Sequence, residues 1–311
     1  MHRPTGSAGI LRTRPFKSGQ SLQMLPNFLI IGAQKAGTTW LYDVLRHHPD
    51  IFLPDTKELS FFNGHHSNLE RNDNFVRLGP GWYENFFRFR RDERAVGDIS
   101  PMYLCDAEAP GRIAQMLPDV RLIAVLRDPV ERAASHYWMA YNKKHVAGDL
   151  DTVISRNDEA IVVRGLYGPQ IERYLRHFPR ENMLILIYEE VMSEKEAALG
   201  EICRFLGVDP DLMPGSNIDR KVNPATSYRM PWLYNASVAF AARLRAIPFL
   251  SWLPRLLKRS GFNEKVKALN TVAFDKPELS EQQRHALRRF YAADRERLEK
   301  LLGRKIGAWP Q

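Results

Sequence analysis

Short apolar runs recur along the chain and alternate with amphipathic segments. Three of these runs have the length of a buried strand: residues 27–32 (NFLIIG), 120–129 (VRLIAVLRDP) and 182–191 (NMLILIYEEV). Each is followed by a segment in which apolar residues return every three or four positions, a spacing typical of a helix. Strands that alternate with helices predict an α/β fold of three layers, in which helices flank a central, largely parallel sheet.

Capping residues indicate where several of the helices begin and end. After the first strand, a helix is predicted from Thr38 to about His48, where Pro49 stops it. Two further segments begin with the spacing of a capping box and end in glycine: Ser193 and Glu196 with Gly207, and Ser280 and Gln283 with Gly303.

Composition and charge indicate a globular protein with an anionic partner. The chain has 311 residues, a formal net charge of +9 and 44% hydrophobic residues. Residues 1–25 are basic, contain no acid and lack the apolar core of a signal peptide, so we expect a mobile tail and a cytoplasmic protein. Residues 26–311 are expected to form a single domain. The alternative to an anionic partner is a surface that is basic throughout and has no single defined partner.

A basic segment near residues 227–267 departs from this pattern. It holds eight Arg or Lys residues, a single acid (Glu264) and several aromatic residues. A helical insertion of this kind can lie on an anionic membrane or line an acceptor groove. The alternative is a helical pair that packs on the core with its basic side chains in water.

The loop after the first strand, GAQKAGTT, resembles a Walker A loop with its lysine displaced. Gly32 and Gly37 have the Walker spacing, but Thr38 stands where the lysine belongs and the lysine is at position 35. Backbone amides at a loop that enters a helix bind anions, and Gly37 lets the ligand approach the backbone. In an ATPase the loop lysine binds the β- and γ-phosphates and the hydroxyl after it binds Mg²⁺. Because the lysine is displaced here, we expect a diphosphate-like ligand that binds without a metal. A glycine-containing turn that serves packing alone is the alternative.

A second anion site is predicted at the same sheet edge. Arg127 ends the second predicted strand, and Ser135 follows eight residues later in the next helix. The arginine fork matches phosphate geometry. A nucleoside with phosphates at both ends would occupy both sites.

Together, QKAGTT and LRDPVERAASHY resemble the sulfotransferase family that uses 3′-phosphoadenosine 5′-phosphosulfate (PAPS). KELSFFNG, residues 57–64, is similar to the heparan sulfate branch and its bacterial relatives. The resemblance covers roughly residues 27–207, with a weaker echo in the final helix and LLGRKIGAW. It implies a P-loop-like fold, PAPS as donor and no metal. The implied acceptor is a carbohydrate, a glycolipid or another small molecule with a hydroxyl or amine, and no nucleic acid is expected.

The resemblance also implies roles for individual residues. The 5′-phosphosulfate loop is expected to comprise Lys35, Ala36, Gly37, Thr38, Thr39 and Trp40, while Arg127 and Ser135 match the 3′-phosphate site. Glu58 matches the general base that takes the acceptor proton, and Lys35 is expected to stabilise the departing phosphate oxygen. The other candidate bases are His136, His65 and His66, and each has a structural or surface role as its alternative.

Two departures from the family pattern concern the acceptor. The heparan branch often has a lysine where this chain has Ile99, so no role of that lysine carries over, and Asp98 is expected to line the cleft. The basic loop that closes on the cofactor before the last helix has only Lys276 as a candidate. The alternative functions are a P-loop nucleotide kinase or ATPase, and a non-catalytic binder of anionic lipid or glycan that uses the basic segment. The sequence leaves open whether the attacking atom is oxygen or nitrogen.

Overall fold

The structure is a computed structural model that describes residues 25–64, 73–143, 145–215, 218, 226–228, 271–273 and 277–310. Most of the predicted basic tail, most of the segment near 227–267, and Lys276, His65 and His66 lie outside these residues. No helix within the described ranges is both long and apolar enough to cross a membrane.

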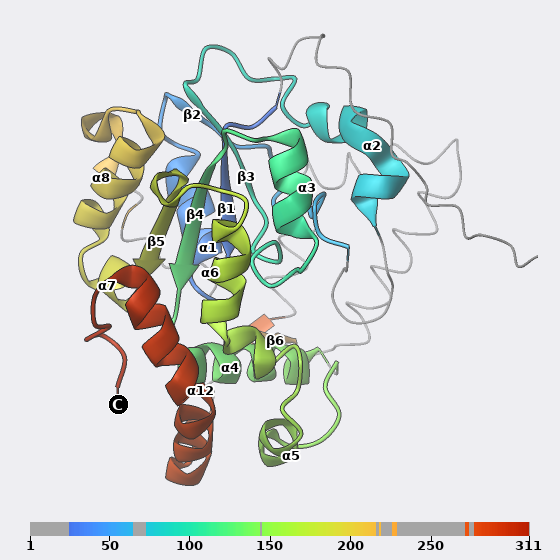
Figure 1. Cartoon of the computed structure of the whole chain (residues 1–311), viewed down its shortest axis with the longest axis vertical. Coiled ribbons are helices and arrows are strands. Elements are labelled where there is room, and N and C mark those ends of the chain that lie inside the picture. The colour runs from blue at the N-terminus through green and yellow to red at the C-terminus, as the bar shows by residue number, and fades with distance from the viewer. Residues whose placement is uncertain are drawn as a thin grey trace, which may run out of the picture.

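A five-stranded parallel sheet forms the centre of the fold (Figure 1). Its strands lie in the order β2-β3-β1-β4-β5, and every neighbouring pair is parallel. The bounds are β1 Phe28–Gly32, β2 Ile51–Phe52, β3 Ala95–Ile99, β4 Arg121–Leu126 and β5 Met183–Ile187. The prediction of a largely parallel α/β sheet is therefore confirmed, as are the three strands β1, β4 and β5.

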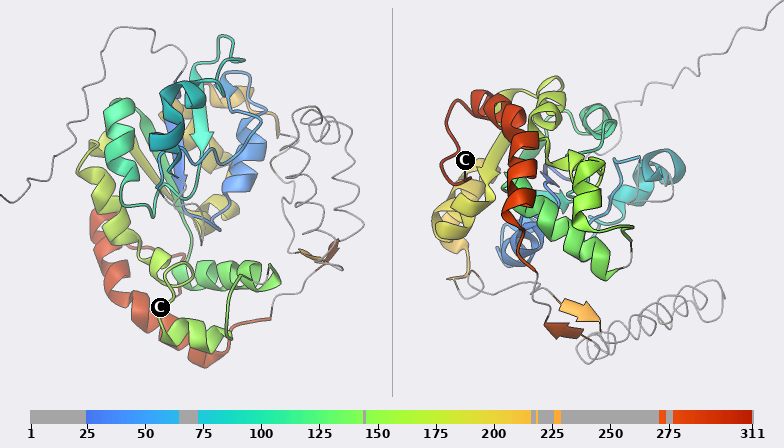
Figure 2. Two further views of the ribbon diagram at one scale, coloured as in Figure 1. Left: turned by 90° about the vertical axis from the view of Figure 1, so that its right-hand side faces the viewer. Right: turned by 90° about the horizontal axis from the view of Figure 1, so that it is seen from below.

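Helices cover both faces of the sheet. Figure 2 shows α3 and α6 on one face and α1 and α8 on the other, with α12 beside α6. The helix bounds are α1 Thr38–Leu45, α2 Asn74–Glu84, α3 Ala109–Met116, α4 Pro129–Asn142, α5 Leu150–Ser155, α6 Tyr167–Leu175, α7 Tyr188–Ser193, α8 Lys195–Leu206 and α12 Glu281–Leu302. Short 3-10 turns are η2 Val163–Gly165, η3 Arg180–Asn182 and η4 Pro210–Leu212, and β6 Thr226–Tyr228 pairs antiparallel with β7 Thr271–Ala273.

Strand β3 contains a glycine because its neighbour fills the space. Gly97 pairs with Phe28 across the β1–β3 ladder, and a Cβ at Gly97 would lie 2.1 Å from the Phe28 ring. The ring is fully buried. Any larger residue at position 97 would displace it from the core.

The helix ends agree in part with the predicted caps. Ser280 and Gln283 form a complete capping box at the start of α12, and Gly207 and Gly303 end α8 and α12 in the left-handed conformation. The capping box at Ser193 is wrong. Ser193 is the last residue of α7, where its Oγ donates a hydrogen bond to the Glu190 carbonyl 2.9 Å away. The hydroxyl is therefore engaged with the preceding helix and does not cap α8.

The carboxyl ends of the parallel strands meet at one edge of the sheet. The loop after β1, the segment after β2 and the turns after β3 and β4 all begin there. The connections lead to opposite sides of β1, since β2 and β3 lie on one side and β4 and β5 on the other, while all strands stay parallel. In open α/β sheets, ligands bind at such a switch point.

Candidate functional site

The loop between β1 and α1 presents backbone amides at the switch point. The first backbone bond of the helix runs from the Leu41 amide to the Gly37 carbonyl at 3.1 Å, so the amides of residues 38–40 lie at the open helix start. Gly37 is the N-cap and supplies no side-chain cap. A helix start of this kind attracts an anion through its amides and its dipole.

Gly37 is required there for two physical reasons. Its φ of 80° lies in the left-handed region, and a Cβ would lie 2.8 Å from the Tyr188 ring. Lys35 also has a positive φ, 74°, and its Nζ lies 3.7 Å from Sδ of Met139 on α4. The loop thus sends its lysine toward α4, the helix that carries Ser135.

The remaining residues expected in this loop lie in the first turn of α1 or next to it. Ala36 and Thr38 are buried, and Thr39 is half-buried. The Trp40 indole is buried and donates to the Ile218 carbonyl at 3.0 Å. Trp40 therefore offers its backbone amide to the loop, while its side chain packs in the interior.

Arg127 and Ser135 line one pocket, as their spacing predicts. The pocket has a volume of about 200 Å³, and Trp138 of α4 and Arg284 of α12 also line it, together with Glu131, Ala134 and residues 277–279. Arg127 donates from Nη1 to the Lys35 carbonyl at 3.3 Å, and its guanidinium lies 5.1 Å from the centre of the Tyr188 ring. Its Nε is buried and has no hydrogen-bond partner among the described residues. A buried donor of this kind fits an anion in the pocket.

The C-terminal tail after α12 is bonded to α7, and α7 is in turn bonded to the turn that carries Arg127. Glu189 accepts the Asp128 amide at 3.0 Å with one carboxylate oxygen and the Trp309 indole at 2.9 Å with the other. Arg304 forms an ion pair with Glu190, 2.6 Å away. The weak resemblance noted for LLGRKIGAW therefore falls on residues that brace the pocket.

Glu58 lies at the same edge, beside the first turn of α1. Lys57 Nζ donates to Thr39 Oγ1 at 3.0 Å and lies 2.9 Å from Glu58 Oε1. The Lys57 side chain is 17% exposed and that of Glu58 is 44% exposed, so the carboxylate reaches solvent while the ammonium is largely enclosed. The structure thus brings Glu58 to the loop after β1 through a residue that was not predicted as part of the site.

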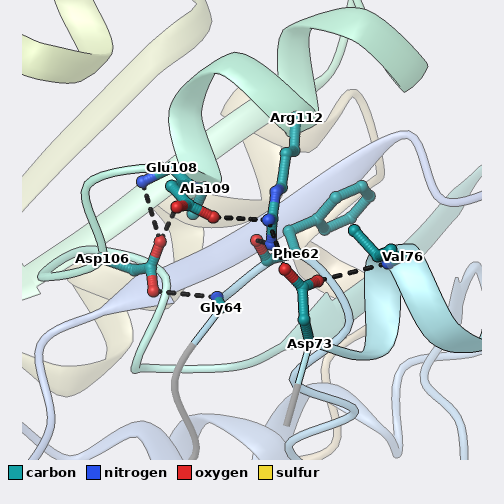
Figure 3. A network of polar contacts seen from close by, with 8 residues as sticks. All are labelled: Phe62, Gly64, Asp73, Val76, Asp106, Glu108, Ala109 and Arg112. Atoms are coloured by element: carbon teal, nitrogen blue, oxygen red, sulfur yellow. Dashed lines mark hydrogen bonds and ion pairs between the residues drawn. The ribbon is translucent and has the colours of Figure 1, made fainter. Parts of the chain in front are cut away.

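Beyond Glu58, the segment up to Gly64 is held by a polar network that Figure 3 shows. Asp106 accepts the Gly64 amide at 3.0 Å and also the amides of residues 108 and 109 at the start of α3. Arg112 of α3 donates to the Phe62 carbonyl at 3.2 Å and pairs with Asp73 at 2.6 Å. This network ties both described residues that flank 65–72 to α3.

One residue near the site, Asp98, lies deeper than expected. Asp98 is 2% exposed, so the expectation that it lines the cleft is wrong. Ile99, where the heparan branch often has lysine, is also 2% exposed.

Burial lowers the pKa of His136 to about 3, and the charges of Arg132, Arg164 and Lys35 add to this shift. A base so weak is poorly suited to take a proton near neutral pH.

Sequence reasoning did not identify several residues of this edge. Lys57 begins the motif KELSFFNG but was given no role, because a lysine next to a glutamate usually forms a solvated surface pair with it. Tyr188 directly follows β5 at the edge where ligands bind, which is a usable positional signal. Arg284 is placed by long-range packing, and no local pattern indicates it. Trp309 ends LLGRKIGAW, which the sequence offered only as a weak resemblance.

Comparison with known proteins finds sulfotransferases by family, by sequence and by structure. Residues 25–224 match the family model described as "Sulfotransferase domain". Human heparan sulfate glucosamine 3-O-sulfotransferase 3B1 is 32% identical over 201 residues, 62% of this chain and 49% of that protein. Mouse bifunctional heparan sulfate N-deacetylase/N-sulfotransferase 4 is 32% identical over 212 residues, 60% of this chain and 23% of that protein.

A solved structure extends the similarity along most of the chain. A sulfotransferase from Alicyclobacillus acidocaldarius superimposes with a TM-score of 0.66 at 25% identity, over 92% of this chain and 99% of that chain. By contrast, the present chain spans about half the length of the human relative and less of the mouse one.

Proposed function

The chain belongs to the sulfotransferase family, and we propose that it transfers a sulfuryl group from PAPS to a hydroxyl or amine of a carbohydrate or glycolipid acceptor. The observation that carries the proposal is the pair of anion sites joined by one hydrogen bond. Arg127, in the pocket with Ser135, donates to the carbonyl of Lys35 in the glycine loop. A ligand with a phosphate at each end matches this arrangement.

The described residues fit the donor. At one end, the amides of residues 38–40 and the Lys35 ammonium are suited to the 5′-phosphosulfate. At the other end, the buried Nε of Arg127 and the Ser135 hydroxyl are suited to the 3′-phosphate. PAPS would supply the sulfuryl group and leave as adenosine 3′,5′-bisphosphate.

Each catalytic residue has one task in this proposal. Glu58, whose carboxylate reaches solvent, accepts the proton that the acceptor loses as it attacks sulfur. Lys35 stabilises negative charge on the phosphate oxygen from which the sulfuryl group departs. The loop and the Arg127 pocket hold the donor in line with the acceptor.

The acceptor class rests on the relatives and on charge. Two curated relatives carry heparan sulfate in their names, and the present chain has a net charge of +9, which favours an anionic polymer. A cytoplasmic location, with peripheral membrane contact through residues 227–267, belongs to the proposal on the strength of the sequence alone. No contact in the structure favours the kinase or the non-catalytic binder, within the described residues.

Calorimetry with three ligands tests the donor site: adenosine 3′,5′-bisphosphate, AMP, and ATP with Mg²⁺. We expect the bisphosphate to bind at least about 10-fold more tightly than AMP, the value of one charged hydrogen bond. Equal affinity for the first two ligands, or a preference for Mg-ATP, would contradict the proposed donor.

Radiolabelled PAPS then identifies the acceptor. The acceptor panel comprises fully N-sulfated heparan sulfate, its N-desulfated form and a neutral glycolipid. Transfer to the N-desulfated form alone indicates an amine acceptor, and transfer to the fully N-sulfated polymer indicates a hydroxyl. Glu58→Gln is expected to bind bisphosphate normally and to transfer sulfate at least about 100-fold more slowly. Normal turnover by this variant would refute the base assignment.

A further inference from the structure

The turn that carries Glu58 is unusual in its backbone. Glu58 has a φ of 61° and Ser60 a φ of 50°, so two non-glycine residues adopt the left-handed conformation within three positions. Such residues persist only where surrounding structure holds them, and they concentrate at functional sites. The contacts of this turn therefore determine where the Glu58 carboxylate points.

Four consecutive amides of the turn are bonded to the end of β3 or to the residues that follow it. The Glu58 amide donates to the Ile99 carbonyl at 3.1 Å, and the Leu59 amide donates to the Asp98 carboxylate. The next two amides reach hydroxyls: Ser60 N donates to Ser100 Oγ at 3.1 Å, and Phe61 N donates to the Tyr103 hydroxyl at 2.9 Å.

Both of these hydroxyls donate in turn to Asp98. Ser100 Oγ lies 3.0 Å from Asp98 Oδ1, and the Tyr103 hydroxyl lies 2.7 Å from Oδ2. A third hydroxyl, that of Tyr83 on α2, lies 3.1 Å from Oδ2. Asp98 thus accepts a hydrogen bond from one amide of the turn directly. It is connected to two more amides through the hydroxyls of Ser100 and Tyr103, which act as relays.

Only a carboxylate suits this position, because each of its hydrogen-bond partners among the described residues donates to it. Asp98 is 2% exposed, and an ionised carboxylate accepts at two oxygens without offering a hydrogen. Burial raises the pKa of Asp98 to about 6, while the hydrogen bonds from Tyr103, Ser100, Tyr83 and the Leu59 amide lower it. A buried network with all members satisfied is rigid, which is what a strained turn requires.

We propose that Asp98 is a positioning residue for sulfuryl transfer, which sets the direction of the Glu58 carboxylate through the amides of residues 59–61. Tyr103 and Ser100 are the relays. The inference rests on the proposed role of Glu58 as general base. Asp98 itself contacts neither donor nor acceptor.

Two tyrosine variants separate positioning from simple stability. Tyr103→Phe removes a hydroxyl that joins Asp98 to the Phe61 amide. Tyr83→Phe removes a hydroxyl that binds the same oxygen of Asp98 but that bonds no amide of the turn. We expect Tyr103→Phe to lower kcat about 10- to 100-fold, the effect of a misplaced catalytic group, and Tyr83→Phe to lower it less than about threefold. Binding of adenosine 3′,5′-bisphosphate should change by less than about threefold in both.

Hydrogen exchange gives a measurement that needs no acceptor. Tyr103→Phe should speed exchange of the amides of residues 58–61 at least about 10-fold, and Tyr83→Phe should leave it within about threefold. Ser100→Ala, which cuts the other relay, should resemble Tyr103→Phe, and it carries the test if Tyr103→Phe does not fold.

The outcomes distinguish this inference from the proposed function. If Glu58→Gln is slow and Tyr103→Phe adds less than about threefold in that background, both stand. If Glu58→Gln is slow but the two tyrosine variants lose activity and protection equally, Glu58 remains the base and the positioning role fails. If Glu58→Gln turns over normally, the base assignment fails and the inference fails with it.

Discussion

The ammonium of Lys57 lies 3.0 Å from the hydroxyl of Thr39, 18 positions earlier in the chain. The same ammonium lies 2.9 Å from Glu58, so one cation joins the first turn of α1 to the proposed base. Its side chain is 17% exposed, which separates it from ordinary solvated surface pairs. Lys57 therefore links Glu58 to the first turn of α1, at the edge of the candidate site.

Removal of the Lys57 charge should slow transfer more than it weakens donor binding. Lys57→Met leaves Glu58 without its cation, and a charged hydrogen bond is worth about 1.5–3 kcal/mol, or roughly 10- to 150-fold in rate. We expect kcat to fall by that factor, while bisphosphate affinity changes less than about threefold. Lys57→Arg, which keeps the charge, is the control. Equal activity of Lys57→Met and wild type would show that the bridge is not used.

Replacement of Arg127 should weaken the binding only of ligands that carry a 3′-phosphate. Arg127→Ala is expected to weaken adenosine 3′,5′-bisphosphate binding by about 1.5–3 kcal/mol, because the phosphate loses a charged donor. AMP affinity should stay within about threefold, which makes AMP the internal control in calorimetry. An unchanged bisphosphate affinity would remove Arg127 from the site.

The Trp309 indole should contribute to stability through its bond to Glu189. Trp309→Phe retains an aromatic ring beside Tyr167 but removes the donor 2.9 Å from the carboxylate. We expect the free energy of unfolding to fall by about 1–2 kcal/mol, as a partly buried acceptor loses its partner. Chemical denaturation measures this change. Wild-type stability in Trp309→Phe would show that water replaces the indole at no cost.

His136 should make the fold sensitive to acid. Its pKa is lowered to about 3 in the fold, from an ordinary 6.5, so below pH 6.5 the unfolded chain takes up a proton that the folded chain does not. This contribution to stability is present above pH 6.5 and is lost as pH falls toward 3, by about 2 kcal/mol between pH 7.5 and 5.

The difference between wild type and His136→Asn isolates this effect. Asp98, whose raised pKa makes its own contribution fall as pH rises from 3.8 to about 6, is present in both proteins and cancels. Denaturation curves at pH 7.5 and pH 5 should show the variant losing about 2 kcal/mol less than wild type. Parallel losses in the two proteins would mean that His136 titrates normally.

Local patterns were sufficient for the elements that depend on local physics. The apolar runs of β1, β4 and β5, the glycine loop and the capping box at Ser280 all follow from neighbouring residues. The convergence of Arg127 and Ser135 on one pocket followed from their spacing after a strand end.

Elements that depend on distant partners were not predicted. Strand β3 was not predicted because Gly97 and Asp98 are poor strand residues, and only the Phe28 ring and the hydroxyls around Asp98 make them fit. The cap at Ser193 failed because the preceding helix, α7, engages its hydroxyl. Lys57 was not recognised because its partner Thr39 lies in another element.

The pocket beside Arg127 also bears on how the protein is made. Arg284 of α12 faces Glu131 of α4 across its wall at 2.7 Å, and the two are 153 positions apart in the chain. A nascent chain that has completed the sheet still lacks this wall until α12 leaves the ribosome. A ligand of this pocket can then stabilise only the completed fold, because a ligand favours the state that binds it. Until that moment the sheet depends on its own core or on a chaperone.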